Sequence, residues 1–509
     1  MVSRCFSMGL VGMNAFTVEL EADLSAGLPN FEIVGLPDTA VKESRERVRA
    51  AIKNCGFEFP VSRITMNLAP ADLKKEGPIY DLPLFIALLK STGQLRKPTD
   101  DCIFLGELSL SGKLRNVRGV LAMAINAKNA GFKNIFLPNV NAKEASVVKG
   151  INVYGAESVF EILSHLQGEK IMEPTKPDDA YDILENLPDF ADVKSQPDAK
   201  RALEIAAAGY HNVLLIGPPG SGKSMLAKRI PSILPQMSFE ESIETTKIHS
   251  VAGKLNKVSS LIKTRPFRSP HHNISPNGLV GGGTNPIPGE ISLSHNGVLF
   301  LDEFPEFAKG SLELLRQPLE EGEVTIARVS GSINYPCNFM LIAAMNPCPC
   351  GYFGHPTRKC TCSPNAVRRY LSKISGPLLD RIDLHVDVPA LSYEELSYKQ
   401  KSESSAEIKA RIDIARQIQN ERFKDYDIRN NSQIPAELLS EFVKLTSDGE
   451  NLIKNSFEKL NLSARAYHRL LKVSRTIADI EESKETETEH LLEAVRYRSL
   501  DRKYWEYEL

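Results

Sequence analysis

A glycine-rich octapeptide near the middle of the chain constrains the possible folds more than any other part of the sequence. It fits the phosphate-loop pattern G-x-x-x-x-G-K-[ST] and consists of Gly217, Pro218, Pro219, Gly220, Ser221, Gly222, Lys223 and Ser224. The apolar run 212–216 before it predicts a strand, and residues 225–228 after it predict the start of a helix. A phosphate loop needs this context, because backbone N–H groups at a helix N-terminus bind phosphate oxygens. The chain is therefore predicted to bind a nucleoside triphosphate.

Two side chains of this loop have predicted roles of their own. Lys223 would neutralise the β- and γ-phosphates, and Ser224 would place its hydroxyl on Mg²⁺. The alternative is a glycine-rich turn without a ligand, and it does not explain the strand–loop–helix order.

A second apolar run ends in a pair of acidic residues. Residues 298–301 predict a strand buried on both faces, and Asp302 and Glu303 follow it directly. Asp302 would hold the hydrated Mg²⁺, and Glu303 would orient or deprotonate the attacking water. A buried strand that merely ends in an acidic turn is the alternative, and the phosphate loop argues against it. Together the two motifs predict hydrolysis of the nucleotide.

Four of the eight cysteines are crowded into one short stretch as two C-x-C pairs, Cys348 with Cys350 and Cys360 with Cys362. In a chain expected to remain in a reducing compartment, such clustering favours metal binding over disulfides. Four thiolates can hold a structural Zn²⁺ tetrahedrally. The alternatives are unliganded thiols on a loop, or His355 in place of one sulfur.

The composition is typical of a globular protein with several domains. The chain has 509 residues, of which 42% are hydrophobic and 25% charged, and its net charge is −2. We find no secretory signal and no run of about 18 apolar residues, and we therefore expect a cytoplasmic protein with no membrane partner. Because the net charge is near zero, contact with nucleic acid would have to come from local basic patches.

Changes in composition divide the chain into five segments. Residues 1–165 mix strand and helix patterns, and residues 166–191 form a polar linker. The predicted nucleotide-binding core spans 192–391. A charged helical connector, 392–433, precedes a helical C-terminal segment, 434–509.

Three longer strings in the core carry a family resemblance. They are RPFRSPHH at 265–272, PGEISLSHNGVLFLDE at 288–303 and GPLLDRID at 376–383. Over essentially its whole length, the chain resembles AAA+ ATPases of the magnesium-chelatase-like branch and, within it, the ComM/YifB family. The resemblance implies an α/β phosphate-loop domain with a parallel sheet, a C-terminal helical lid, and the use of ATP and Mg²⁺.

The resemblance also assigns roles to four residues outside the two motifs. Asn346 would be sensor 1, which positions the water near the γ-phosphate, and Gln196 would lie near the adenine. Arg465 would be sensor 2 on the helical lid. Arg381 would be an arginine finger that reaches the nucleotide of a neighbouring subunit, which implies a ring and usually a homo-hexamer.

Three of these four residues have simpler alternatives. Asn346 could cap a turn, and Arg465 could be an ordinary surface residue of a helix. Arg381 stands between Asp380 and Asp383 in the sequence and could form a local salt bridge.

The interval between the two nucleotide-binding motifs is long and rich in glycine and proline. Residues 253–289 resemble the helix-2 insertion of the AAA+ group that includes the MCM helicases, and residues 323–329 resemble its pre-sensor-1 hairpin. Arg328 would then contact a DNA phosphate in a central pore, and the alternative is a solvated strand residue. His271 and His272 lack metal-ligand spacing, and we interpret them as insertion-loop residues that meet DNA or a neighbouring subunit.

The N-terminal segment resembles the proteolytic domain of Lon and the C-terminal domain of RadA, an α+β fold like domain 2 of ribosomal protein S5. Lon uses a serine and a lysine for catalysis. Here Ile79 stands where the serine would be, and Ala122 stands where the lysine would be. Neither side chain can attack a carbonyl or move a proton. We therefore expect a non-proteolytic domain that assists ring assembly or DNA binding.

The leading hypothesis from the resemblance is a ring-forming ATPase that acts on DNA as a helicase or branch-migration motor during transformation or repair, with a recombinase as a possible partner. A chelatase-type or protein-remodelling ATPase without a DNA substrate is the first alternative. An ATP-dependent protease is the second, and the missing serine and lysine predict no proteolysis.

Overall fold

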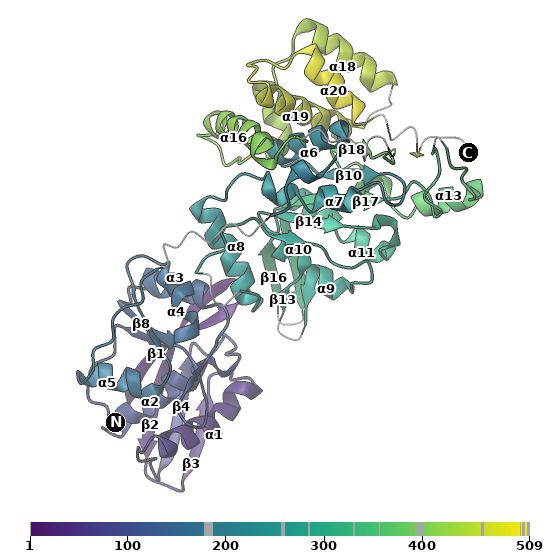
Figure 1. The fold of residues 1–509 in the computed structure, drawn as a ribbon. Helices are drawn as coiled ribbons and strands as arrows, with labels where there is room; N and C mark the ends of the chain where they lie inside the picture. Colours follow the sequence, from purple (N-terminus) through teal and green to yellow (C-terminus); the bar gives the residue numbers. More distant parts are fainter. Residues whose placement is uncertain are drawn as a thin grey trace. The chain divides into compact units, whose positions relative to one another are not determined.

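The computed structural model divides the chain into two compact units (Figure 1). The first comprises Met1–Asp182 together with Phe239–Ile262, and the second comprises Ile183–Ser238 together with Lys263–Leu509. The segment 239–262 thus groups with the N-terminal domain, although it lies inside the range 192–391 predicted for the core.

The structure describes residues 2–177, 187–255, 260–283, 286–328, 331–355, 357–391, 393, 402–459, 463–498, 500, 504 and 505. Residues 178–186 of the predicted linker, and residues 392 and 394–401 of the predicted connector, lie outside this part, as do 460–462, 499, 501–503 and 506–509 of the predicted helical segment.

A seven-stranded sheet forms the centre of the first unit, in the order β3-β4-β2-β1-β5-β8-β9. Its strands are β1 (Ser3–Val11), β2 (Asn14–Ser25), β3 (Asn30–Val34), β4 (Arg63–Ala69), β5 (Cys102–Phe104), β8 (Asn134–Pro138) and β9 (Asn152–Ala156). β2 pairs antiparallel with β1 and β4, and the other neighbours are parallel. Val18, Leu20 and Ala22 on β2 are fully buried and alternate with less buried residues, as expected for a strand with one face on the core.

Among the described residues of this unit, the remaining elements are six α-helices, one 3₁₀ helix and a short hairpin. They are α1 (Thr39–Asn54), η1 (Pro78–Tyr80), α2 (Asp81–Ser91), β6 (Glu107–Leu108), β7 (Leu114–Arg115), α3 (Val120–Asn129), α4 (Asn139–Ser146), α5 (Val159–Gln167) and α8 (Phe239–Val251). Ile79 in η1 and Ala122 in α3 are both buried, at 6% and 4% exposure. The two positions that resemble the catalytic pair of Lon are therefore occupied by buried apolar side chains.

Helix α8 joins this unit through polar contacts to α3 and α4. The carbonyl of Ser250 accepts a hydrogen bond from the Gly119 N–H at 3.3 Å, and the Ser250 hydroxyl donates to the Glu144 carboxylate. Glu144 also accepts from the Leu121 N–H at 2.9 Å. Burial raises the pKa of Glu144 above its ordinary value.

A five-stranded parallel sheet forms the centre of the second unit, in the order β11-β14-β17-β10-β18. Its strands are β10 (Val213–Ile216), β11 (Phe267–Arg268), β14 (Val298–Leu301), β17 (Met340–Met345) and β18 (Leu384–Asp387). Every residue of β10, β14 and β17 is buried, which explains why these strands are continuous apolar runs in the sequence. The expected α/β fold with a parallel sheet is confirmed.

Short elements surround this sheet. They are η2 (Phe190–Asp192), α6 (Pro197–Gly209), α7 (Lys223–Ala227), η3 (Ile230–Ser232), α9 (Pro276–Val280), β12 (Gly281–Gly282), β13 (Ile287–Pro288), α10 (Glu290–Leu293), η4 (Phe304–Glu306), α11 (Lys309–Glu313), α12 (Arg316–Glu321), β15 (Glu323–Arg328), β16 (Gly331–Pro336), α13 (Pro364–Leu371) and α14 (Gly376–Leu379). β15 and β16 form an antiparallel hairpin at the stretch that resembles a pre-sensor-1 hairpin.

The C-terminal part of this unit is helical, as expected. It contains α16 (Ser405–Arg422), η5 (Asn431–Gln433), η6 (Ala436–Leu438), α17 (Leu439–Phe442), α18 (Ser447–Lys459), α19 (Ala464–Ile480) and α20 (Thr488–Arg496). Its buried residues belong to the same hydrophobic core as those of the parallel sheet. Within the described residues, no helix combines the length and apolar character needed to cross a membrane.

Candidate functional site

The predicted nucleotide-binding residues follow three adjacent strands of the parallel sheet. β10 lies next to β17, and β17 lies next to β14, with Ile216 opposite Met345 and Leu301 opposite Ala343. Because the carboxyl ends of parallel strands meet at one edge of a sheet, the phosphate loop, Asp302 and Asn346 are brought together. A search along the sequence finds each motif separately, and the strand order explains why they share one site.

Glycine is required in the phosphate loop for two different reasons. Gly222 has φ +90°, a left-handed backbone conformation that residues other than glycine rarely adopt. At Gly217, a Cβ would lie 2.1 Å from the carbonyl oxygen of Val388, which leaves no room for a side chain. The loop therefore runs close to the segment that follows β18.

Lys223 lies inside the loop. Its Nζ donates to the carbonyl oxygens of Gly217 at 2.8 Å and Pro218 at 2.9 Å, and to Oδ1 of Asn346 at 3.2 Å. Burial lowers the pKa of Lys223 to about 8, and the charge of Asp302 acts in the opposite direction. The expected sensor 1 residue and the phosphate-loop lysine are therefore in direct contact.

Ser224 and Asp302 present a pair of oxygen ligands. The Ser224 hydroxyl donates to Oδ2 of Asp302 at 2.6 Å, and Oδ1 of Asp302 accepts from the Glu303 N–H at 2.9 Å. A hydroxyl and a carboxylate are the hard oxygen donors that Mg²⁺ prefers. The two side chains thus fit the Mg²⁺ role predicted for them.

Glu303 is held by a residue whose role the sequence did not reveal. Its backbone is left-handed, with φ 52° and ψ 45°, which is uncommon for a residue with a side chain. Oε2 of Glu303 lies 3.0 Å from Nδ1 of His272, and the His272 ring lies 4.1 Å from the ring of His271. Of the two histidines assigned to the insertion loop, His272 therefore contacts the candidate general base.

Gln196 contacts the phosphate loop. Its Nε2 donates to the carbonyl oxygen of Ser221 at 2.5 Å, and both Gln196 and Ser195 have positive φ. Gln196 is buried, and its Oε1 has no hydrogen-bond partner within the described part of the chain. The start of α6 is thereby fixed against the loop.

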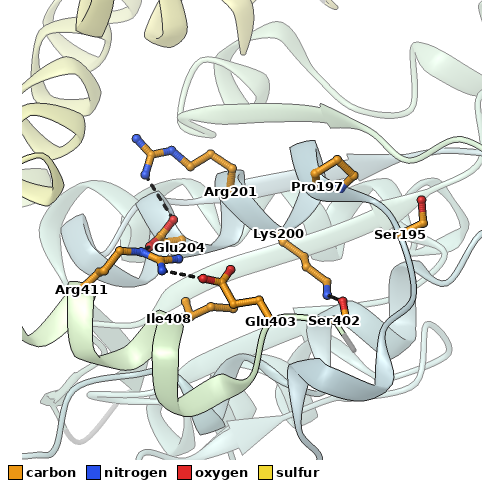
Figure 2. Close-up of a pocket in the computed structure, with 9 residues that line it drawn as sticks. All are labelled: Ser195, Pro197, Lys200, Arg201, Glu204, Ser402, Glu403, Ile408 and Arg411. Carbon is orange, nitrogen blue, oxygen red and sulfur yellow. Dashed lines mark hydrogen bonds and ion pairs between the residues drawn. The ribbon is translucent and has the colours of Figure 1, made fainter. Parts of the chain in front are cut away.

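A pocket of about 510 Å³ lies beside this start of α6 (Figure 2). Its charged side chains pair with one another: Arg201 with Glu204 at 3.2 Å, and Arg411 with Glu204 and Glu403. Lys200 donates to the Val193 carbonyl at 2.7 Å and to the Ser402 hydroxyl. The arginines and glutamates of this pocket thus pair with one another, whereas Lys200 bonds to two neutral oxygens.

The two predicted catalytic arginines meet at one carboxylate, Glu320 of α12. Arg381 is only 4% exposed and donates to Glu320 and to the carbonyl of Pro377, at 2.6 Å in the latter case. Nη2 of Arg465 lies 2.9 Å from Oε1 of Glu320. The hydrogen bond from Arg381 and the charges of both arginines lower the pKa of Glu320. Arg381 therefore does form a salt bridge within the chain, but with Glu320 and not with its sequence neighbours.

The four clustered cysteines converge. The Sγ of Cys348 lies 3.3 Å from that of Cys350 and 3.7 Å from that of Cys360, and all four sulfurs, including that of Cys362, lie within 4.8 Å of one another. Tetrahedral Zn²⁺ with Zn–S bonds of about 2.3 Å places its sulfurs about 3.8 Å apart. The donor set and its spacing fit Zn²⁺.

Arg328 is the last residue of β15 and pairs across the hairpin with Gly331. The contact of Arg328 with DNA in a central pore stays a prediction.

Comparisons with known families cover most of the chain. Residues 189–396 match the family described as magnesium chelatase, subunit ChlI, residues 20–141 match subunit ChlI of Mg-chelatase, and residues 402–498 match magnesium chelatase, subunit ChlI C-terminal.

Two relatives are similar over nearly their full lengths. The uncharacterized protein YifB of Escherichia coli is 45% identical over 97% of this chain and 96% of its own length. Competence protein ComM of Haemophilus influenzae is 43% identical over 98% of this chain and 97% of its own length. A shorter likeness, 32% identity over 95 residues, links 19% of this chain to 21% of the DNA repair protein RadA of Listeria monocytogenes.

Proposed function

The chain belongs to the magnesium-chelatase-like AAA+ family of which ComM and YifB are members, and on this basis we propose that it is a ring-forming ATPase that acts on DNA. The convergence of Lys223, Ser224, Asp302 and Asn346 at one edge of the parallel sheet carries this proposal. A nucleotide-binding protein without hydrolytic activity would not need the second carboxylate, Glu303, beside that edge.

Each residue of the site has a part in the proposed reaction. Lys223 binds the β- and γ-phosphate oxygens, and Ser224 and Asp302 hold Mg²⁺, which would neutralise charge on the phosphates. Glu303 orients the attacking water, and Asn346 positions that water near the γ-phosphate. Gln196 holds the start of α6 against the loop, on the side proposed for the adenine.

Arg381 and Arg465 act on the nucleotide of a neighbouring subunit in this proposal. Both guanidinium groups already lie together, and a single carboxylate, Glu320, pairs with both. A triphosphate carries more negative charge than Glu320 and would compete for them at a subunit interface. The site is then complete only in an assembly, for which we propose a homo-hexamer.

DNA is the proposed substrate on two grounds. The β15–β16 hairpin carries Arg328 as the last residue of β15, and a cation there could contact phosphates without reading bases. The names of two relatives, competence protein ComM and DNA repair protein RadA, point to processes that involve DNA. We propose helicase or branch-migration activity on recombination intermediates in the cytoplasm, where a recombinase would be a suitable partner.

A chelatase-type or protein-remodelling ATPase is the second candidate, because all three matching families are described as parts of magnesium chelatase. ATP hydrolysis measured without DNA and with single-stranded, duplex and forked DNA distinguishes the two. We expect stimulation by DNA that weakens steeply with salt, since phosphate contacts release counterions.

Two variants sharpen this experiment. Lys223→Ala controls for contaminating ATPases, and Arg328→Ala should lower the stimulation by DNA. A rate that is indifferent to every DNA at low salt would instead favour the remodelling ATPase. The four cysteines are proposed to hold one structural Zn²⁺ in either case.

A further inference from the structure

We propose that Zn²⁺ bound by the four cysteines acts as a brace on the ATP site, holding the phosphate loop and Asn346 in place. This inference rests on the proposed nucleotide site. We define the metal knuckle as the described residues between Cys348 and Cys362.

The first connection between the knuckle and the ATP site is covalent. Cys348 follows Asn346 by two residues, at the end of β17, and is fully buried. Asn346 in turn accepts a hydrogen bond from Nζ of Lys223 at 3.2 Å. Fixing the sulfur of Cys348 therefore fixes the chain immediately after the residue proposed to position the water.

The second connection is a direct contact with the phosphate loop. Gly351 has φ +83°, and a Cβ at this position would lie 2.4 Å from Cδ of Pro219. The backbone of the knuckle thus packs against the phosphate loop with no space for even one methyl group. Pro219 has a rigid ring, so this contact restrains the loop conformation without a hydrogen bond.

Within its described residues, the knuckle contains no helix or strand that could hold it in shape. α13 begins only after Cys362, with Ser363 as its N-cap. Most of the knuckle's described residues are partly or fully exposed, and among them Cys348 and Gly351 are buried. Ordering such a loop costs conformational entropy, and no apolar core offsets it.

The four cysteine sulfurs can hold the knuckle in shape by binding a metal ion. Backbone N–H groups point at two of them: Phe353 N–H at 3.3 Å from Sγ of Cys348, and Cys350 N–H at 3.4 Å from Sγ of Cys362. Hydrogen bonds of this kind to the ligand atoms of a metal site hold those atoms in position. Metal binding then orders the loop, as it does in small zinc domains.

Two variants of the full chain test the brace. Cys360→Ser combined with Cys362→Ser removes two ligands, whereas Gly351→Ala leaves all four thiols and pushes a methyl group against Pro219. Cys55→Ser, far from the cluster in sequence and in the first unit, is the matched control. For each protein we would measure the zinc content, the affinity for a fluorescent ADP analogue, hydrogen exchange in the peptide 217–224, and ATP hydrolysis.

We expect about one zinc per chain in the wild type, Cys55→Ser and Gly351→Ala, and less than about a tenth of an equivalent in the double variant. The double variant and Gly351→Ala should both show faster exchange in 217–224 and weaker ADP binding, by about tenfold or more, with unchanged circular dichroism. Because Gly351→Ala keeps its zinc, its defect separates the brace from a general loss of folding.

Two results would overturn the brace. One is a wild-type chain purified without zinc whose peptide 217–224 is fully protected from exchange. The other is a zinc-free double variant with unchanged exchange and ADP affinity. If the wild type hydrolyses no ATP, the proposed function fails, while zinc content, exchange and ADP binding still decide for or against the brace.

Discussion

At the scale of single residues, the candidate nucleotide site consists of buried or strained groups that form hydrogen bonds and ion pairs with neighbouring residues of the site. Lys223 donates to the carbonyls of its own loop, and Glu303 adopts a left-handed backbone and contacts His272. A lysine with a lowered pKa and a strained acidic residue are both typical of functional sites, because the fold has to hold them against their intrinsic preferences.

The pKa of Lys223 predicts how nucleotide affinity depends on pH. Burial lowers this pKa to about 8, and bound phosphates would raise it, because they favour the charged form. A group whose pKa rises on binding contributes affinity that is complete below about pH 8 and is lost as the pH rises above it. We expect the dissociation constant of an ADP analogue to rise by up to about tenfold per pH unit between pH 8 and 9.

This dependence should disappear in Lys223→Met, which cannot change its charge. Calorimetric titrations in buffers of different ionisation enthalpy should show uptake of protons when the wild type binds the analogue at pH 8. An affinity that is flat from pH 7 to 9 would contradict the assignment.

The contact between His272 and Glu303 predicts that the histidine limits the activity of Glu303 as a general base. Because the carboxylate bonded to His272 is also needed by the attacking water, His272→Ala should raise the ATPase rate without DNA. The expected rise is about fivefold, the factor that corresponds to a net hydrogen bond of ~1 kcal/mol. Steady-state kinetics should show the change in kcat and not in KM.

Two further variants test the geometry of this contact. His272→Asn keeps a hydrogen-bond donor and should stay near the wild-type rate, and His271→Ala should have a smaller effect than His272→Ala. A fall in kcat for His272→Ala would mean that the histidine supports catalysis and does not restrain it.

At the scale of elements, the helical C-terminal part is fastened to the parallel sheet by buried ion pairs. Oδ1 of Asp383, just before β18, accepts from Nη1 of Arg469 on α19 at 2.9 Å, and Oδ2 accepts from the Asn212 N–H at 2.9 Å. Within the helical part itself, Arg422 of α16 and Arg475 of α19 pair with Asp479 of α19. Arg381 and Arg465 thus belong to the same compact unit as these ion pairs.

The lowered pKa of Asp383 predicts how the stability of the second unit depends on pH. Burial alone would raise its pKa, but Arg469 and His211 lower it below the ordinary value of 3.8. A depressed carboxyl pKa contributes stability that is present above the ordinary pKa and is lost as the pH falls below it. Asp383→Asn should lower the free energy of unfolding by ~3 kcal/mol at pH 7, because it leaves the guanidinium of Arg469 without its carboxylate partner, and by less at pH 3.

The measurement is urea unfolding followed by the fluorescence of Trp505, the single tryptophan of the chain, which belongs to this unit. Asp380→Asn is the matched control, since Asp380 is more exposed and lies 3.9 Å from its partner Arg498. Equal losses of stability in the two variants would argue against a special role for the buried pair.

At the scale of the whole molecule, one segment belongs to a different unit from the residues on either side of it in the sequence. The chain leaves the second unit after α7 and η3, contributes α8 to the first unit, and returns at Lys263. The first unit is thus built from two separate stretches of the sequence.

Whether a feature of the fold or of the candidate site could be predicted depends on how far apart its residues lie in the sequence. The phosphate loop, Asp302 and Glu303 are local patterns, and the buried strands that position them are continuous apolar runs. The sequence alone was therefore enough to predict these strands and the two motifs that follow them. The pairing of Arg381 with Glu320 joins residues far apart in the chain, and no periodicity signals it. Similarly, the buried residues of α8 include four serines and threonines, and this composition did not indicate that the helix packs in the first unit.

The central claim is that each catalytic site is shared by two subunits, with Glu303 from one and Arg381 from the next. Its most direct test is to mix Arg381→Ala with Glu303→Gln chains and to measure ATP hydrolysis. Each variant alone should be nearly inactive, and an equal mixture should regain about a quarter of the wild-type rate, the share of interfaces that contain both intact residues. Wild-type hydrolysis by Arg381→Ala alone, or no recovery in a mixture shown to co-assemble, would contradict the account.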